Sequence, residues 1–282
     1  MRKQILVSCL CLSMAASLMG GMSVSAEETG LNTEGKLVVG FDAEYPPYGY
    51  MDDNGDYTGF DLELAEALCE IEGWELVKQP IDWDSKDTEL NSGSIDCIWN
   101  GFTMDGREDA YTFSVPYVNN SEVVITAENS GISSLADLAG KIVGVQADSA
   151  ALTLLEEGGD QADLGATFGT LQQFADNNTA FAELMAGSLD AVALDIGVAL
   201  YQINRREGYV ILDEYLNAEK YAIGFKKGND TLAEIVNKDL GILYENGIFM
   251  ELAEKYEIAD MVCLADTLGL AEAGTEAETE AE

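Results

Sequence analysis

The chain has 282 residues, of which 47% are hydrophobic, and a formal net charge of −38 at pH 7. This length fits two lobes of about 100 residues each, and the hydrophobic content is sufficient for packed cores. A surface this acidic repels nucleic acid and anionic lipid headgroups, so we expect neither as a partner.

The first 26 residues have the composition of a secretory signal peptide. Arg2 and Lys3 precede an apolar run over residues 5–19, and a small-residue cleavage site ends at Ala26. The run is too short and interrupted for a membrane-spanning helix, and no later segment is apolar enough to span a bilayer. We therefore predict an extracytoplasmic protein, periplasmic, cell-surface or secreted. A lipid anchor on Cys9 is the less favoured alternative.

Metal and disulfide chemistry have little support in the composition. The chain has no histidine, which is the commonest metal ligand and general base. The processed chain would keep Cys69, Cys97 and Cys263, whose odd number and wide spacing argue against a disulfide framework and a zinc site. We expect Cys69 and Cys97 to be small core residues, and we expect no cofactor and no bound metal.

Strand-like and helix-like segments alternate along the chain, which indicates an α/β fold. In the first half, the predicted elements are strand 36–41, helix 61–71 before Gly73, strand 95–99, a helix from residue 107, a short helix capped by Ser134, and strand 141–146. In the second half, they are strand 166–169 with helix 171–185, strand 191–194 with helix 196–205, and a last helical block 231–256.

Two of the predicted strands end in polar residues. These are Asp42 and Tyr45 after strand 36–41, and Asn100, Gly101, Thr103 and Arg107 after strand 95–99. In open α/β sheets, ligands lie at the carboxyl ends of strands. An aromatic face, small polar groups and one arginine suit a zwitterionic amino acid better than a phosphate or a metal.

Several segments resemble the bacterial extracellular solute-binding proteins that deliver polar amino acids to ABC importers, which form family 3 of such proteins. The resemblance spans residues 36–257. The segments that carry it are YPPY at 45–48, GFD at 59–61, FSVPY at 113–117, GKIVGVQ at 140–146 and LDAVALD at 189–195. Their order and spacing make the resemblance specific.

The resemblance implies a two-lobed, periplasmic-binding-protein-like type II fold with two hinge strands. The implied organisation is a signal peptide at 1–26, lobe 1 at 35–120 and 218–262, lobe 2 at 121–217, and an acidic disordered tail at 263–282. It also implies a monomer that encloses its ligand between the lobes by hinge closure and docks on a membrane permease.

In this family, an arginine at the position of Arg107 holds the ligand's carboxylate, and an aspartate at the position of Asp195 receives its α-ammonium. A guanidinium matches a carboxylate with two parallel hydrogen bonds. The alternatives are a surface ion pair of Arg107 with Glu108 or Asp109, and a plain N-cap role for Asp195.

The remaining candidate positions follow from the same resemblance. Thr103 and the backbone of Gly101 would add hydrogen bonds to the carboxylate, and Ser149 lies at a helix start with free N–H groups. Tyr45 and Trp83 would sandwich the ligand's side chain, unless they are packing residues.

Asp42 would meet the distal polar end of the ligand, and Asn100 would shape the floor of the pocket. Glutamine is the first guess for the ligand, with a basic amino acid or cystine next. We expect a binding protein and not an enzyme. The alternatives are a secreted dehydratase or lyase that uses Asp42 or Glu44 as an acid, and a sensory ligand-binding module.

Overall fold

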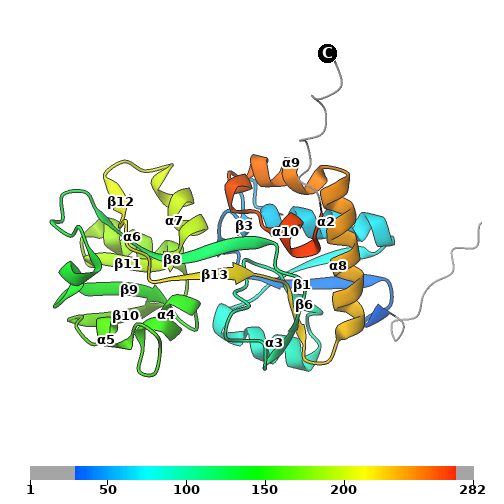
Figure 1. The fold of residues 1–282 in the computed structure, drawn as a ribbon, viewed down its shortest axis with the longest axis horizontal. Coiled ribbons are helices and arrows are strands. Elements are labelled where there is room, and N and C mark those ends of the chain that lie inside the picture. The colour runs from blue at the N-terminus through cyan, green and yellow to red at the C-terminus, as the bar shows by residue number, and fades with distance from the viewer. Residues whose placement is uncertain (1–28, 271–282) are drawn as a thin grey trace, which may run out of the picture.

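The computed structural model describes residues 29–270, and the predicted signal peptide lies outside this range. The described chain forms two lobes joined by two long strands (Figure 1). These connecting strands are β8 (Val118–Ala127) and β13 (Asn217–Tyr221), which pair antiparallel. The α/β, two-lobed fold class expected from the sequence is confirmed.

Lobe 1 is built on a five-stranded sheet of order β5-β1-β6-β14-β7, in which β1 runs parallel to β5 and β6. Its strands are β1 (Lys36–Phe41), β5 (Glu75–Pro80), β6 (Cys97–Ile98), β7 (Tyr111–Phe113) and β14 (Gly224–Lys226). A small sheet adds β2 (Glu44–Tyr45), β3 (Gly49–Met51) and β4 (Tyr57–Thr58). The helices of this lobe are α2 (Phe60–Glu72), η1 (Trp83–Ser85), α3 (Lys86–Ser92), α8 (Asp230–Glu245), α9 (Ile248–Lys255), η3 (Ala259–Met261) and α10 (Leu264–Leu268).

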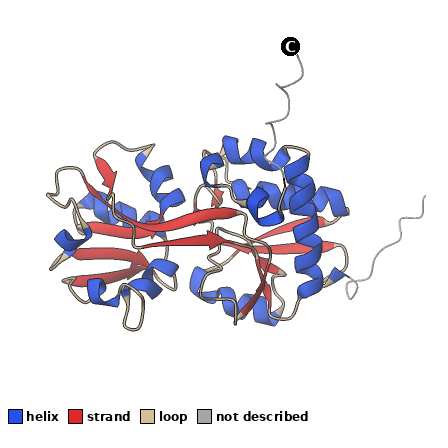
Figure 2. Ribbon diagram, in the orientation of Figure 1, coloured by secondary structure: helices blue, strands red, loops and turns tan. Residues whose placement is uncertain are grey.

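Lobe 2 is built on a sheet of order β10-β9-β11-β8-β12, with β13 also paired to β8. Its own strands are β9 (Ile142–Gln146), β10 (Thr170–Phe174), β11 (Ala191–Asp195) and β12 (Tyr209–Ile211). Its helices are η2 (Leu135–Leu138), α4 (Ala150–Leu155), α5 (Ala162–Gly165), α6 (Asn177–Ala186) and α7 (Ile196–Ile203). Helices flank the strands in both lobes (Figure 2).

Local signals in the sequence explain several of these boundaries. Helix α2 ends at Gly73, whose φ of 70° is left-handed and whose N–H bonds the carbonyl of Cys69. Ser134 and Asp137 form the expected capping box before η2. Cys69, Cys97 and Cys263 are free and buried.

Two predicted helical segments differ from the structure. Residues 170–174 form strand β10, which pairs in parallel with β9, so strand 166–169 and helix 171–185 were both misplaced. The helix α6 begins only after Asp176, whose side chain caps the N–H of Thr179. The block 231–256 is two helices, α8 and α9, because Gly247 adopts a left-handed φ of 84° between them.

The predicted disordered tail from residue 263 is wrong for its first part. Helix α10 folds onto the end of lobe 1, where Leu264 is fully buried and Ala265 nearly so. Burial of these apolar side chains against α8 provides the stabilisation that the acidic composition alone did not predict. Residues 271–282 lie outside the described range.

Candidate functional site

A cavity of about 640 Å³ lies between the lobes. Lobe 1 contributes Asp42, Ala43, Glu44, Pro80, Ile81, Asp82, Trp83, Asp84, Ser85 and Glu89, and lobe 2 contributes Ala147, Ala175 and Asp176. We call this space the inter-lobe cavity. It takes in two of the predicted site residues, Asp42 and Trp83.

Contacts across the rim of the inter-lobe cavity hold the lobes together. Gln146 donates from Nε2 to Asp42 Oδ2 at 2.8 Å, and Asn178 donates from Nδ2 to Glu44 Oε2 at 2.7 Å. Lys86, a buried residue of α3, forms an ion pair with Asp148 of lobe 2. The structure is therefore a closed arrangement of the two lobes.

Asp42 is fixed by its neighbours and withdrawn from water. Its N–H donates to Asn100 Oδ1 at 2.9 Å, which places Asn100 behind the cavity as a support for the backbone. Burial raises the pKa of Asp42 to about 6, against the lowering effect of hydrogen bonds from Glu44 N–H and Gln146.

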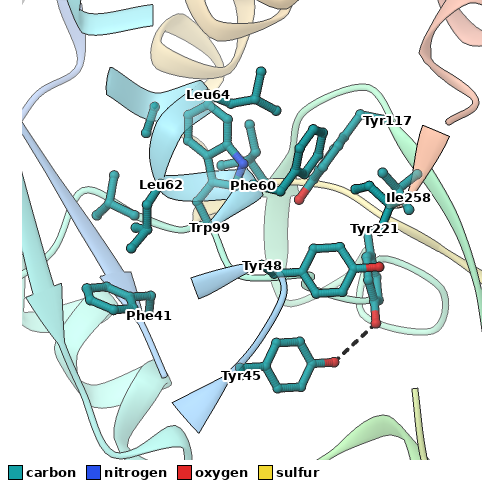
Figure 3. Packing of buried hydrophobic residues seen from close by; sticks show 14 of the residues in the cluster. Phe41, Tyr45, Tyr48, Phe60, Leu62, Leu64, Trp99, Tyr117, Tyr221 and Ile258 are labelled. Atoms are coloured by element: carbon teal, nitrogen blue, oxygen red, sulfur yellow. Dashed lines mark hydrogen bonds between the residues drawn. The ribbon is translucent and has the colours of Figure 1, made fainter. Parts of the chain in front are cut away.

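Trp83 provides the aromatic surface of the inter-lobe cavity. Its ring meets Phe102 edge to face at 5.8 Å between centroids. Tyr45, the other predicted wall, is not among the lining residues. It is 6% exposed and lies in a cluster with Tyr48 and Tyr221, to whose hydroxyl its own is hydrogen bonded at 3.1 Å (Figure 3). In this arrangement Tyr45 is a packing residue.

Arg107 lies in a turn between β6 and β7, and the helix predicted to start there is absent. Its carbonyl accepts from Ala110 N–H at 3.0 Å, which closes the turn, and β7 begins at Tyr111. The guanidinium donates to the carbonyl of Thr103 at 3.3 Å and lies 4.8 Å from the centre of the Phe102 ring. Within residues 29–270 it forms no ion pair with Glu108 or Asp109.

Asp195 ends β11 and precedes α7, but its side chain makes no capping bond to that helix. The carboxylate instead accepts hydrogen bonds from Asn120 Nδ2 at 2.8 Å and from the hydroxyl of Tyr221. Burial raises the pKa of Asp195, and these donors oppose the shift. Arg107 and Asp195 thus come from different lobes, and neither lines the inter-lobe cavity.

Two other predicted residues, Gly101 and Ser149, have structural partners. The N–H of Gly101 donates to buried Asp61 at 2.6 Å, so it is not free for a ligand carboxylate, contrary to expectation. A Cβ at Gly101 would lie 3.0 Å from the Tyr45 ring, at a φ of 56°, which explains the glycine. Ser149 is an N-cap that accepts the Leu152 N–H at 3.1 Å.

Thr103 is hydrogen bonded to one of two buried acidic residues that the sequence analysis missed. Its hydroxyl donates to Glu219 Oε1 at 2.7 Å, and Asn120 Nδ2 donates to the same oxygen at 2.8 Å. Glu219 on β13 faces Asn120 across the connecting strands. Glu122, two residues along β8, is fully buried, and neither of its carboxylate oxygens has a hydrogen-bond partner.

Glu122, Asp195 and Glu219 each offer a carboxylate oxygen within 4.8 Å of the others, and we call them the buried trio. Among the described residues, this group could surround a single cation. Burial and the neighbouring carboxylates raise the pKa of Glu122 well above its usual value and that of Glu219 to about 7. The local sequence contains no clear signal, because Glu122 follows the polar residues 119–121 and only borders the apolar run VVITA.

These features define a two-lobed binding protein with an acidic cavity between its lobes. Residues 37–258 match the family model described as bacterial extracellular solute-binding proteins, family 3. The chain belongs to this family, as its sequence motifs indicated.

The similarity to known proteins covers most of this chain and most of each relative. The L-cystine-binding protein TcyJ of Escherichia coli (strain K12) is 30% identical, with 88% of this chain and 94% of that protein covered. The arginine-binding extracellular protein ArtP of Bacillus subtilis (strain 168) is also 30% identical, with 89% and 96% covered. A solved ABC uptake transporter substrate-binding protein from Streptococcus pneumoniae with bound histidine superposes with a TM-score of 0.77 at 32% identity, covering 80% of this chain and 94% of that one.

Between residues 29 and 270, no helix has both the length and the apolar character needed to cross a membrane.

Proposed function

We propose that this chain is the extracytoplasmic substrate-binding component of an amino-acid ABC importer and that its ligand is an L-amino acid with a cationic side chain. The family and the three relatives named above support an amino-acid ligand. The observation that carries the choice of side chain is the charge of the inter-lobe cavity.

Among residues 29–270, those that line the inter-lobe cavity include carboxylates from both lobes and no lysine or arginine. The six acidic residues are Asp42, Glu44, Asp82, Asp84, Glu89 and Asp176. A cleft lined by one sign of charge concentrates ligands of the opposite sign. Such a field favours a guanidinium or ammonium side chain over the neutral amide of glutamine, so it reverses the order of ligands that the sequence suggested.

Trp83 gives the cavity an aromatic wall. Lys86 Nζ already lies 5.3 Å from the centroid of the Trp83 ring, so a ligand cation would share the indole with Lys86. Asp42 would provide that cation with a carboxylate.

The α-carboxylate and α-ammonium of the ligand would be held by Arg107 and Asp195. These residues come from different lobes, so a bound zwitterion would link the lobes and favour their closure. Neither residue lines the cavity in the closed arrangement, so we propose that the ligand reaches them when the lobes open.

We propose reversible binding without covalent chemistry. A dehydratase or lyase would need an acid that reaches its substrate, and Asp42, with a pKa of about 6, is the candidate in the cavity. Incubation with prephenate, arogenate or peptidoglycan would produce turnover if this alternative held. A sensory role would instead need a receptor partner, whereas an importer needs a permease.

A thermal-shift panel of the twenty amino acids plus L-cystine tests the proposal. Ligand binding raises the midpoint of unfolding by mass action. L-arginine or L-lysine should give the largest shift, and L-glutamine a smaller one. A panel in which no amino acid shifts the midpoint would overturn the function. A panel led by glutamine would overturn the side-chain class only.

A further inference from the structure

The buried trio lies where the connecting strands meet lobe 2. Glu122 comes from β8, Asp195 from the end of β11 and Glu219 from β13. They are 0%, 6% and 6% exposed. Three carboxyl groups from three strands therefore share one buried space.

Within the described part of the chain, no lysine or arginine forms an ion pair with the trio. The hydrogen bonds that Asp195 and Glu219 accept come from neutral groups, namely the amide of Asn120 and the hydroxyls of Tyr221 and Thr103. Arg107 is the nearby positive charge, and its attraction lowers the pKa of Glu122 and Glu219, but its guanidinium hydrogen bond goes to the Thr103 carbonyl.

Glu122 is the group without a hydrogen-bond donor. Within residues 29–270, neither of its buried carboxylate oxygens accepts a hydrogen bond, and one lies within 4.8 Å of carboxylate oxygens of Asp195 and Glu219. The Asp195 carboxylate is close enough to accept a hydrogen bond from the acid form of Glu122. A buried polar group without a partner costs about 1–3 kcal/mol, and more when it is charged. Such a side chain is stable either with a proton or with a cationic ligand beside it.

The spacing of the trio fits a primary ammonium. Three charge-assisted N–H···O bonds of about 2.8 Å, directed tetrahedrally, place their acceptors about 4.6 Å apart. The three carboxylate oxygens all lie within 4.8 Å of one another, so one ammonium could contact all three. In the closed structure, the Tyr221 hydroxyl donates to Asp195, where an ammonium could donate instead.

We propose that Glu122 and Glu219 complete, with Asp195, a three-carboxylate subsite for the ligand's α-ammonium, and that Glu122 gives up a proton to water when the ammonium enters. The inference rests on the proposed function. The ammonium keeps its own three protons, the O–H bond of Glu122 breaks, and the released proton goes to the buffer. No bond to the ligand forms.

The groups that face Glu122 make the exchange favourable in this direction. Asp195 and Glu219 repel its negative form, and Arg107 attracts it. Burial adds to the repulsion, so without ligand the acid form of Glu122 is favoured. An ammonium among the three oxygens reverses this balance, because it supplies the missing positive charge at hydrogen-bond distance.

The test is calorimetric titration of the full mature chain with L-arginine at pH 7.5 in phosphate and in Tris, which differ in ionisation enthalpy. If the thermal-shift panel selects another amino acid, that one is the titrant. The wild-type protein should release about one proton per ligand bound. Glu122→Gln, which mimics the neutral acid, should release none and bind at least tenfold more weakly. Glu66→Gln, which removes a carboxylate of α2 that is 60% exposed and lies outside the cavity lining, should still release the proton.

Other outcomes would each overturn the inference in a distinct way. Equal heats in both buffers for the wild type, with binding intact, would remove the proton exchange and leave the proposed function standing. No binding of any amino acid would remove both. 5-Guanidinopentanoic acid, which is arginine without its α-amino group, should bind at least a hundredfold more weakly, and unchanged affinity would place the ammonium elsewhere.

A metal ion is the competing occupant, and it is tested with the same variants. If CaCl₂ gives a binding heat with the ligand-free protein that Glu122→Gln abolishes, the trio is a divalent-cation site and the ammonium subsite is wrong. We expect that CaCl₂ gives no binding heat with the ligand-free protein and that arginine binding releases a proton.

Discussion

The inter-lobe cavity and the buried trio are both acidic, but their carboxylates differ in exposure to solvent. Glu44, Asp82 and Asp84 of the cavity are exposed, whereas Glu122 and Glu219 of the trio are buried. Exposed charges are screened by salt and act mainly on the rate at which a charged ligand arrives. Buried charges need a proton or a partner. The same residue types can therefore attract a ligand at one place and hold it at the other.

The largest effect should come from the groups that would hold the ends of the zwitterion. Arg107→Ala or Asp195→Ala should weaken amino-acid binding by at least tenfold, because loss of one partner of a buried charge pair costs about 2–5 kcal/mol. Arg107→Lys should also weaken binding, since an ammonium cannot form the two parallel bonds of the guanidinium. Calorimetry measures the affinities.

Lys238→Ala is the control for the loss of a positive charge. Lys238 lies on α8 with its side chain 60% exposed and paired to Glu72 and Asp239, and it is not among the residues that line the cavity. Its affinity should equal that of the wild type. If Arg107→Ala and Asp195→Ala also bind normally, the assignment of the zwitterion ends to these residues is refuted.

The next effect is on the stability of the ligand-free protein. Burial raises the pKa of Asp61 from 3.8 to about 7 and that of Glu219 from 4.5 to about 7. A raised carboxyl pKa means that the folded state holds the proton more tightly than the unfolded state. The stability from these groups is therefore complete below about pH 4 and is lost as the pH rises to 7.

The unfolding midpoint of the ligand-free protein should accordingly rise by at least about 3 °C between pH 8 and pH 5.5, which corresponds to about 1 kcal/mol for a chain of this size. Glu122→Gln should melt above the wild type at pH 8, because it removes a buried carboxyl group that must lose a proton, and should depend less on pH. Differential scanning calorimetry measures both. Equal midpoints at the two pH values would contradict the buried state of these carboxyl groups.

The smallest effect should come from the exposed cavity carboxylates. Asp82→Asn and Asp84→Asn together should slow the association of a cationic amino acid by about threefold at low salt, with a smaller difference at high salt. Stopped-flow fluorescence, with Trp83 as a probe in the cavity wall, measures the rate. An equal rate for a neutral amino acid in wild type and variant is the control. A change that is independent of salt would argue against electrostatic steering.

Local sequence was sufficient for much of the fold. The apolar run of residues 36–41, the helical spacing before Gly73 and the capping box at Ser134 each depend on neighbours in the chain, and all three appear in the structure. The motif order identified the family for the same reason, since the motifs mark turns and strand ends. Residues 170–174 were misread because pairing with β9, a distant contact, determines that strand.

The candidate site was predictable only in part. Asp42 and Trp83 were assigned to a cleft, and both line the cavity. Gly101 and Tyr45 were assigned to the ligand, but their bonding groups are used by Asp61 and Tyr221, residues 40 and 176 positions away. No local pattern reports such partners.

The sequence by itself determined the alternation of strands and helices, the family and the strong negative charge, because these follow from composition and from short-range spacing. Tertiary structure alone decided which carboxylates face water and which face one another. Glu122, Asp195 and Glu219 are separated by 73 and 24 residues along the chain, yet strand pairing around β8 brings their oxygens within 4.8 Å. Their chemistry depends on that distance and on their burial, and neither quantity can be predicted from the order of the residues in the chain.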